Sequence, residues 1–296
     1  MLTGLSAFPL TPLRDDELDE HAFASLIEDL VNAGVDSIGA LGSTGSYAYL
    51  DRTERRRVAQ LAVTHAGEVP VVVGIGATRT AHVQALADDA QEAGASAVLL
   101  APVSYQRLTD DDVFGLYEDV TAGLSVPLVV YDNPGTTHFQ FSDQLYAAIA
   151  ALPNVASIKI PGVPADPDAA AERIATIRAV VPSTVTIGVS GDAMAATGLS
   201  AGCDAWYSVI AGTLPHAART IADPAIAGDA DAARAASARL QPLWDLFREH
   251  GSLRVTAAIA EQLGLVTQNC LPRPIRGLDA RARSTVRSTV DELRLS

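Results

Sequence analysis

Lys159 is the only lysine among the 21 Lys and Arg residues of the chain. A lysine amine can lose its proton and attack a carbonyl carbon, whereas a guanidinium stays protonated. Lys159 stands near the end of the β-branched run 155–160, and side chains alternate between the two faces of a strand. Ser157 shares its face, while Ile158 and Ile160 form an apolar face that we expect to pack on helices. Lys159 would then point into the interior, where burial lowers its pKa and makes the amine a candidate nucleophile.

A structural role is the alternative for Lys159, as the cation of an ion pair with a carboxylate of the protein. Asp132 is the only acidic residue at the predicted ends of the strands 127–131, 155–160 and 204–209. The sequence therefore favours a reactive lysine over a paired one.

Tyr131 ends the preceding β-branched run, in which it shares a face with Val129. We expect its hydroxyl to lie beside Lys159, where a phenol can relay protons while a carbonyl compound is attacked and rearranged. A tyrosine at a strand end is otherwise more often a core residue whose hydroxyl contacts water. The nearby lysine favours the catalytic interpretation.

A segment rich in glycine and hydroxyl groups, Gly42–Ser46, follows another apolar run. Its glycines allow backbone N–H groups to converge on an anion, and the hydroxyls of Ser43 and Thr44 add donors, so a small carboxylate is the expected guest. Asp51, with Glu54 three residues later, predicts the start of a helix just beyond it. A serine-rich turn without a ligand is the alternative, since short motifs of this kind are common.

Short β-branched runs alternate with longer amphipathic segments, which is the pattern of parallel strands joined by helical crossovers. The predicted strands are Leu2–Phe8, Asp36–Leu41, Pro70–Ile75, Ala95–Leu100, Pro127–Tyr131, Val155–Ile160, Thr184–Val189 and Asp204–Val209. The predicted helices are 20–32, 52–65, 79–93, 110–122, 142–151, 168–180, 192–201 and 214–223. Repeats of about 25 to 30 residues close into a barrel, so we predict an α/β fold, a (β/α)₈ TIM barrel.

The rest of the chain carries no strand signal. It predicts helices near 229–249, 252–263 and 279–294, with a proline-rich break at 271–274. We therefore expect a catalytic barrel domain over residues 1–225 and a C-terminal helical appendage over residues 226–296.

A doubly wound dinucleotide-binding fold is the alternative to the barrel, but no glycine-rich turn follows the first predicted strand. Gly74-Ile75-Gly76 after the third strand lacks the third glycine of that motif and indicates close backbone packing instead. A barrel with a phosphate site is also disfavoured, because the loops after the seventh and eighth strands contain no glycine-rich amide cradle.

The net charge of −14 disfavours binding to nucleic acid or to anionic membranes. The run Arg55–Arg57 follows Asp51 and Glu54 in one predicted helix, and we interpret it as a solvated helix face. An anionic substrate must then be held locally, by amides, hydroxyls or a single well-placed cation.

Cys203 and Cys270 stand apart from each other and from histidines, which predicts neither a metal site nor a disulfide framework. No apolar run reaches the roughly 18 residues of a membrane span. The start of the chain lacks the basic residues of a signal peptide. We expect a cytoplasmic protein.

The loop Gly42–Gly45, the strand end Tyr131–Pro134 and Lys159, in this order on an eight-fold barrel, resemble the dihydrodipicolinate synthase/N-acetylneuraminate lyase family. The likeness covers about residues 2–225 and extends more weakly into the tail. Members of this family form a Schiff base between a lysine and pyruvate, and they are commonly homotetramers.

The resemblance implies that Ser43 and Thr44 hold the pyruvate carboxylate, that Tyr131 shuttles protons and that Lys159 forms the imine. The stretches that begin at Ser190 and Tyr207 resemble those whose backbone carbonyls line the lysine pocket, which makes Gly191 and Tyr207 substrate-binding candidates. A further catalytic candidate is Tyr105, close to a tyrosine that some members contribute across a subunit interface.

Three positions depart from the family pattern. Ser46 stands where the loop usually has a glutamate, and Ile160 where an acidic residue usually follows the lysine. Thr136 occupies the place of the arginine that grips the second substrate's carboxylate in the true synthases, so Thr136 would face that substrate here.

We therefore expect a Schiff-base-forming lyase or aldolase that acts on pyruvate or a related 2-oxo acid and an aldehyde, without metal or cofactor. We do not expect a true dihydrodipicolinate synthase. The alternative is a barrel that binds a 2-oxo acid without turnover, as a sensor or a degenerate enzyme.

Overall fold

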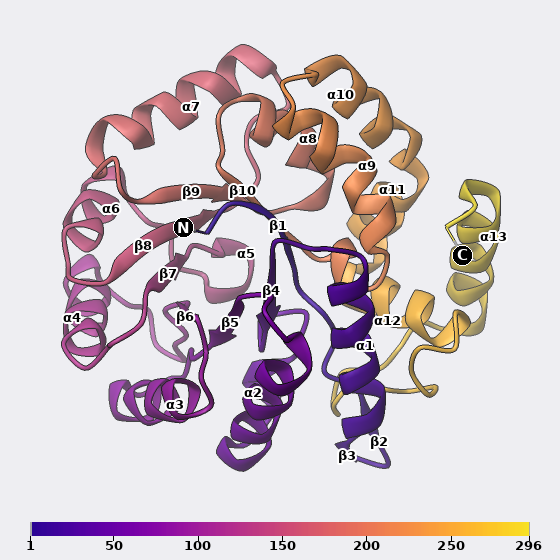
Figure 1. Cartoon of the computed structure of the whole chain (residues 1–296), viewed down its shortest axis with the longest axis horizontal. Coiled ribbons are helices and arrows are strands. Elements are labelled where there is room, and N and C mark those ends of the chain that lie inside the picture. The colour runs from indigo at the N-terminus through magenta and orange to yellow at the C-terminus, as the bar shows by residue number, and fades with distance from the viewer. Residues whose placement is uncertain (1, 296) are drawn as a thin grey trace.

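The structure, a computed structural model, describes residues 2–295 and contains a closed barrel of parallel strands (Figure 1). The barrel strands are β1 (Gly4–Ala7), β4 (Ser37–Ala40), β5 (Val71–Gly74), β6 (Ala97–Leu100), β7 (Leu128–Tyr131), β8 (Val155–Ile160), β9 (Thr186–Val189) and β10 (Ala205–Ser208). They are hydrogen-bonded in the order β1-β10-β9-β8-β7-β6-β5-β4, and β4 pairs with β1 to close the ring. The predicted (β/α)₈ barrel is confirmed.

Helices surround the barrel and continue beyond its last strand (Figure 1). They are α1 (Glu20–Asn32), α2 (Arg52–Ala66), α3 (Thr80–Glu92), α4 (Asp110–Thr121), α5 (Pro134–Thr137), α6 (Asp143–Ala150), α7 (Pro167–Val180), α8 (Ala195–Ser200), α9 (Pro215–Ile226), α10 (Ala230–Arg239), α11 (Gln241–His250), α12 (Ser252–Gln262) and α13 (Ala280–Leu293). Short 3₁₀ turns lie at η1 (Tyr47–Tyr49), η2 (Asp192–Met194) and η3 (Ile210–Gly212).

Two local differences from the sequence prediction have simple causes. The predicted helix 229–249 is divided at Leu240 into α10 and α11, because Pro242 fits the first turn of a helix but not its interior. A small hairpin of β2 (Leu13–Arg14) and β3 (Glu17–Leu18) was not predicted. Strands of two residues are too short to show an alternation.

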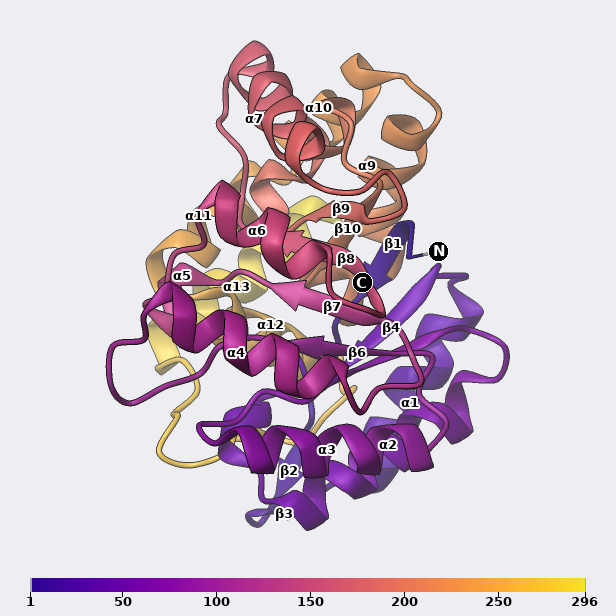
Figure 2. The ribbon, with the colours of Figure 1, turned by 90° about the vertical axis from the view of Figure 1, so that its left-hand side faces the viewer.

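The two faces of the strands build two different cores. Outward-facing residues such as Ile158 and Ile160 join the large cluster that packs on the helices, as predicted. In Figure 2, helices α4 and α6 lie in front of strands β6–β8. Inward-facing residues, among them Phe8, Val129 and Tyr207, form a separate cluster inside the barrel. A polar side chain that points into this inner core is removed from contact with water.

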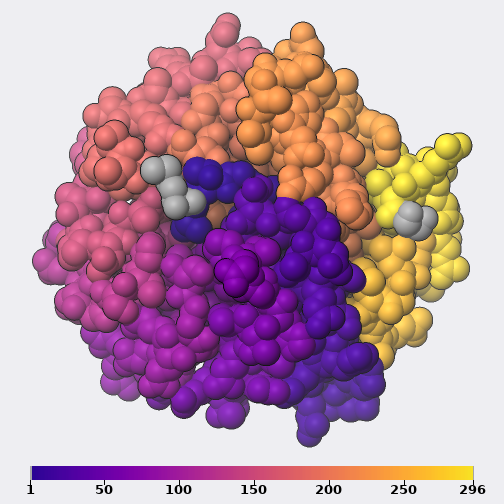
Figure 3. Space-filling model, viewed as in Figure 1, coloured from indigo at the N-terminus to yellow at the C-terminus, as the bar shows by residue number. Residues whose placement is uncertain are grey.

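The start of the chain lies across the centre of the face seen in Figure 3. Leu2 packs there against the cluster inside the barrel. Because this segment covers one end of the barrel, the opposite end, at the carboxyl ends of the strands, is the accessible one.

The C-terminal helices lie on one side of the barrel, near α1 (Figure 1). Leu10 and Leu26 from the barrel form a small core with residues of the tail, including Cys270, whose carbonyl accepts a hydrogen bond from Leu13 N at 2.8 Å. The division into residues 1–225 and 226–296 stays a prediction, and Met1 and Ser296 lie outside the described residues. Among residues 2–295, no helix is long and apolar enough to cross a membrane.

The arginine run on α2 corrects one prediction. Arg56 and Arg57 are solvated and pair with Glu92 and Glu20, but Arg55 is only 5% exposed. Successive residues of a helix point about 100° apart, so one member of the run faces the barrel. There it donates to the backbone carbonyls at the end of β5, at 2.9 Å for Gly74 and 3.0 Å for Gly76.

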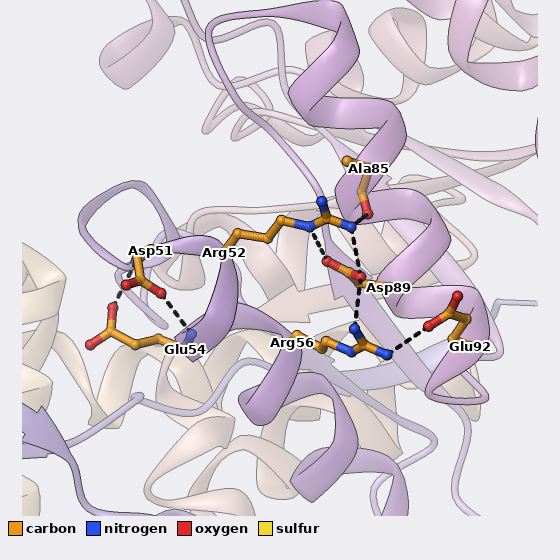
Figure 4. Close-up of polar contacts among 7 residues, drawn as sticks. All are labelled: Asp51, Arg52, Glu54, Arg56, Ala85, Asp89 and Glu92. Atoms are coloured by element: carbon orange, nitrogen blue, oxygen red, sulfur yellow. Dashed lines mark hydrogen bonds and ion pairs between the residues drawn. The ribbon is translucent and has the colours of Figure 1, made fainter.

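The solvated side of α2 is drawn in Figure 4. Asp51 and Glu54 form the predicted capping box at the start of the helix. Arg52 pairs with Asp89 of α3 at 2.6 Å and also donates to the Ala85 carbonyl, while Arg56 pairs with Glu92 at 2.8 Å. These contacts join α2 to α3 at the surface, whereas Arg55 joins α2 to the barrel.

We expect Arg55→Met to lower the free energy of unfolding by about 3–5 kcal/mol, because two buried carbonyls lose charge-assisted hydrogen bonds. Arg56→Met, the matched control on the solvated face, should change it by about 0.5 kcal/mol or less. Urea unfolding followed by circular dichroism at one fixed protein concentration measures both. Equal effects of the two substitutions would contradict the assignment of Arg55 as a buried tie.

Candidate active site

Lys159 lies inside the barrel near the end of β8 and is only 4% exposed. Three aromatic rings surround its amine: Nζ lies 4.3 Å from the ring centre of Tyr131, 5.0 Å from that of Phe8 and 5.6 Å from that of Tyr207. The inward orientation predicted from strand alternation is confirmed. The amine is therefore held among ring faces rather than in water.

Burial lowers the pKa of Lys159 from 10.5 to about 7, and the negative charge of Asp192 opposes that shift. Lys159 forms no ion pair with a carboxylate among residues 2–295. A substantial fraction of the amine is therefore neutral near pH 7, which is the state that attacks a carbonyl.

Asp192 follows β9 and is the acidic residue whose charge acts on Lys159, a role that the sequence analysis did not assign to it. Its carboxylate accepts hydrogen bonds from Trp206 Nε1 at 3.1 Å, Val209 N at 3.1 Å and Ile210 N at 2.7 Å. These donors hold it in place away from direct contact with the amine. Its position just after the seventh barrel strand was the feature of the sequence that could have identified it as a residue close to the lysine.

Asp132, the acidic residue considered as a partner of Lys159, faces another way. Its carboxylate accepts a hydrogen bond from Tyr146 of α6 at 2.5 Å, and only its backbone N–H reaches the Lys159 carbonyl. Burial raises the pKa of Asp132 to about 6, against the opposing effects of Tyr146 and Arg173. Asp132 ties β7 to α6 and does not neutralise the amine.

Tyr131 meets Ser43 and Asn133 in a triangle of hydrogen bonds. The Tyr131 and Ser43 hydroxyl oxygens are 3.4 Å apart, and Asn133 Nδ2 lies 3.0 Å from the first and 3.4 Å from the second. Burial raises the pKa of Tyr131, while the hydrogen bond with Ser43 opposes this and the charge of Asp132 adds to it. Asn133 was missed, although residues 131 and 133 share a face by strand alternation.

The predicted loop and Tyr207 also lie at this end of the barrel. Thr44 is buried in the same loop as Ser43. The side chain of Tyr207 fills the interior, with its hydroxyl 2.7 Å from Ser157 Oγ and its ring near Lys159. A side chain at Gly188 would collide with that ring, 2.2 Å from it. The resemblance concerned the backbone at Tyr207, whereas here its ring also forms a wall of the lysine pocket.

The remaining predicted residues lie at the rim. Gly191 precedes η2 with φ of 82°, and its carbonyl accepts a hydrogen bond from Met194 N at 2.8 Å. Thr136 is exposed on α5. Tyr105 is 94% exposed in the loop after β6 and does not join the Lys159 cluster of its own chain. A cavity of about 910 Å³ lies beside this rim, with Arg107 and His138 in its wall.

No group of three or more His, Cys, Asp or Glu side chains that could hold a metal ion occurs in residues 2–295. The chemistry available from the described side chains is that of an amine nucleophile beside hydroxyl and amide proton donors and acceptors.

A family model described as the dihydrodipicolinate synthetase family matches residues 1–293. The 4-hydroxy-tetrahydrodipicolinate synthase of Methylococcus capsulatus is 31% identical over 293 residues, covering 98% of this chain and 98% of that protein. That of Azoarcus sp. is 32% identical over 269 residues, covering 90% of each. A crystal structure of dihydrodipicolinate synthase from Agrobacterium tumefaciens has a TM-score of 0.94 at 45% identity and covers 98% of each chain.

We expect the Lys159 amine to titrate near pH 7, because burial penalises its charged form. As the only lysine, it gives one set of side-chain signals in protein labelled with ¹³C-lysine, and the Cε shift follows its protonation. Asp192→Asn should move the midpoint to lower pH, because a charge that favours the ammonium is removed. A wild-type midpoint near 10.5 would contradict this account of the site.

Proposed function

Since the chain belongs to the dihydrodipicolinate synthetase family of class I lyases, we propose that its Lys159 forms a Schiff base with the ketone of pyruvate or a related 2-oxo acid. The second substrate in this proposal is an aldehyde other than aspartate semialdehyde. The observation that carries the proposal is the buried amine of Lys159, which has a pKa of about 7 and lies 4.3 Å from the Tyr131 ring.

The proposed reaction begins with the neutral amine of Lys159, which attacks C2 of the 2-oxo acid and forms a carbinolamine. Tyr131 gives its proton to the departing hydroxyl, water leaves, and the nitrogen lone pair forms the C=N bond of the iminium. The iminium then accepts the electron pair when C3 loses a proton or when the C3–C4 bond to an aldehyde fragment breaks. Metal ions are not needed in this scheme, because the iminium supplies the polarisation.

Ser43 and Thr44 are proposed to hold the substrate carboxylate with their hydroxyls and the amides of their loop. Support comes from the contact of Ser43 with Tyr131, whose ring centre lies 4.3 Å from the amine. Gly191 and Tyr207 complete the pocket in this proposal, Tyr207 through its ring and its backbone. The donors are neutral, which suits a small anion that must enter a protein of net charge −14.

We further propose a homotetramer in which Tyr105 reaches the site of a neighbouring subunit. The 94% exposure of its ring in a single chain supports a contact outside that chain. The cytoplasmic location expected from the sequence stays a prediction.

Reduction in the presence of pyruvate should add one three-carbon unit to Lys159. Borohydride reduces the iminium to a stable secondary amine, and intact mass with peptide mapping locates it. Lys159→Arg should give no adduct there and no turnover, because a guanidinium stays protonated and cannot attack. An adduct confined to the α-amine of Met1, or the absence of any adduct, would refute the proposed mechanism. An adduct at Lys159 with no turnover across a panel of aldehydes would favour the alternative of a barrel that only binds.

The choice of aldehyde rests on Thr136. The relatives named above are synthases. The sequence resemblance indicates that such enzymes bind the carboxylate of the second substrate with an arginine at the position of Thr136. A charge-assisted, bidentate arginine holds a carboxylate more tightly than one neutral hydroxyl does. The loss of roughly 1–2 kcal/mol of binding energy to that carboxylate corresponds to about a 5- to 30-fold decrease in kcat/KM. We therefore propose an uncharged or hydroxylated aldehyde as the partner.

With pyruvate and aspartate semialdehyde, we expect kcat/KM to fall below the ordinary enzyme range of about 10⁴ M⁻¹s⁻¹. Thr136→Arg should raise it about ten-fold or more, while Thr136→Gln, which adds length without charge, should not. A coupled assay of dihydrodipicolinate formation measures all three proteins. Efficient wild-type turnover would overturn the proposed aldehyde class and direct attention to Arg107 at the neighbouring cavity.

A further inference from the structure

Asn133 is the one amide in the hydrogen-bonded triangle next to the amine. Its Nδ2 lies 3.0 Å from the Tyr131 oxygen and 3.4 Å from Ser43 Oγ, and those two oxygens are 3.4 Å apart. Both bonds run from the amide to a hydroxyl that the proposed reaction uses.

The backbone of Asn133 is fixed by the turn that it begins. Its carbonyl accepts hydrogen bonds from Thr136 N and Thr137 N, both at 2.9 Å, and from Thr137 Oγ1 at 3.1 Å. Pro134 disfavours a helical backbone at the residue before it, and Asn133, with φ of −140° and ψ of 67°, lies outside the helical region. Its side chain makes no capping bond to α5, so the amide is committed to Tyr131 and Ser43.

We propose that Asn133 is a positioning residue of the proton relay, whose amide N–H donates to the Tyr131 oxygen and directs the tyrosine proton toward the substrate on Lys159. This inference rests on the proposed Schiff-base function. It assigns to a residue of the same chain the task of fixing the direction of proton transfer.

The direction follows from how a phenol uses its oxygen. A hydroxyl oxygen that accepts the amide N–H keeps its own O–H free to donate elsewhere. When that proton passes to the hydroxyl of the carbinolamine, the C–O bond breaks, water leaves, and the phenolate keeps the electron pair. The amide then donates to a full negative charge, and hydrogen bonds to charged groups are about twice as strong as neutral ones.

The return step uses the same atoms. The phenolate takes a proton from C3 of the iminium, the C3–H electron pair becomes the C2=C3 bond, and the C=N pair returns to nitrogen to give the enamine. Burial opposes the formation of a phenolate at Tyr131. The Asn133 donor reduces that penalty and so should speed both proton transfers.

Exchange of the C3 hydrogens of pyruvate with D₂O tests this without any knowledge of the aldehyde, because the phenol exchanges its proton with solvent between turnovers. Exchange is followed by ¹H NMR of the pyruvate methyl group, with Tyr131→Phe as the reference for a broken relay. Asn133→Ala should slow exchange roughly 10-fold, the effect of one lost donor. The pyruvate concentration at half-maximal rate and the final extent of the borohydride adduct at Lys159 should stay unchanged, because the donor affects the rates of proton transfer.

Asn133→Asp separates donation from shape, because the carboxylate nearly matches the amide in size but only accepts hydrogen bonds. We expect exchange in this variant to be at least as slow as in Asn133→Ala at neutral pH, and to recover relative to wild type as the pH falls and the acid is protonated. Asn32→Ala, at an exposed position at the end of α1, is the matched control and should exchange like wild type.

Wild-type exchange in both Asn133 variants would overturn the inference. So would an Asn133→Asp variant as active as wild type beside a slow Asn133→Ala variant, since the side chain would then act by its shape or as an acceptor. Absence of both the Lys159 adduct and exchange in the wild-type protein would instead refute the Schiff-base function itself. If Asn133→Ala fails to fold, the near-isosteric Asn133→Asp variant decides the question alone.

Discussion

The burial of one amine without a directly bonded carboxylate is the constraint on which the active site depends. Lys159 sits among three aromatic rings, and the loss of water lowers its pKa to about 7. The negative charge of Asp192 acts on the amine from a distance and favours its protonated form, which opposes the effect of burial on the pKa. A carboxylate in contact would hold the lysine protonated, whereas a wetter pocket would return its pKa toward 10.5. The interior of this barrel gives a result between these two, in which the amine is buried but has no carboxylate of residues 2–295 in direct contact.

Arg55 shows the opposite solution to the same physical problem. Like Lys159 it is buried, but it lies between α2 and the barrel rather than inside the barrel, and two backbone carbonyls accept its N–H groups. Burial still lowers its pKa, to about 10, so that it remains charged at neutral pH. One buried cation thus ties a helix to a strand, whereas the other has no hydrogen-bonded acceptor among residues 2–295 and is the proposed nucleophile. The difference lies in the acceptors within reach, as well as in the chemistry of the two side chains.

The hydrogen-bonded triangle of Tyr131, Ser43 and Asn133 depends on the packing of the strands that carry it. Tyr131 and Lys159 are partners in the register of β7 and β8, so their side chains leave the sheet side by side. Ser43 arrives from the loop after β4, across the mouth of the barrel, and Asn133 from the turn after β7. A neutral hydroxyl and an amide therefore bond to the Tyr131 hydroxyl, and the Tyr131 ring centre lies 4.3 Å from the amine. Such donors can bind an anion and stabilise a phenolate without adding a charge that would hold the lysine protonated or repel it.

The sequence by itself determined the barrel, the inward orientation of Lys159 and its proximity to Tyr131. Strand alternation and the regular succession of strands and helices are local, periodic properties, and such properties can be read from the order of residues along the chain. It also predicted the capping box of α2 and the close backbone packing at Gly74, where an added Cβ would lie 1.9 Å from the Leu41 carbonyl oxygen. Only the tertiary structure decided which member of the arginine run is buried, that Asp192 rather than Asp132 acts on the lysine, and that the Asn133 amide bonds to Tyr131 and Ser43. Each of these depends on the direction of a side chain across a gap between elements far apart in the sequence, or on a turn whose geometry alternation alone does not specify. Electrostatic effects depend on those distances and on burial, and neither is contained in residue type or spacing.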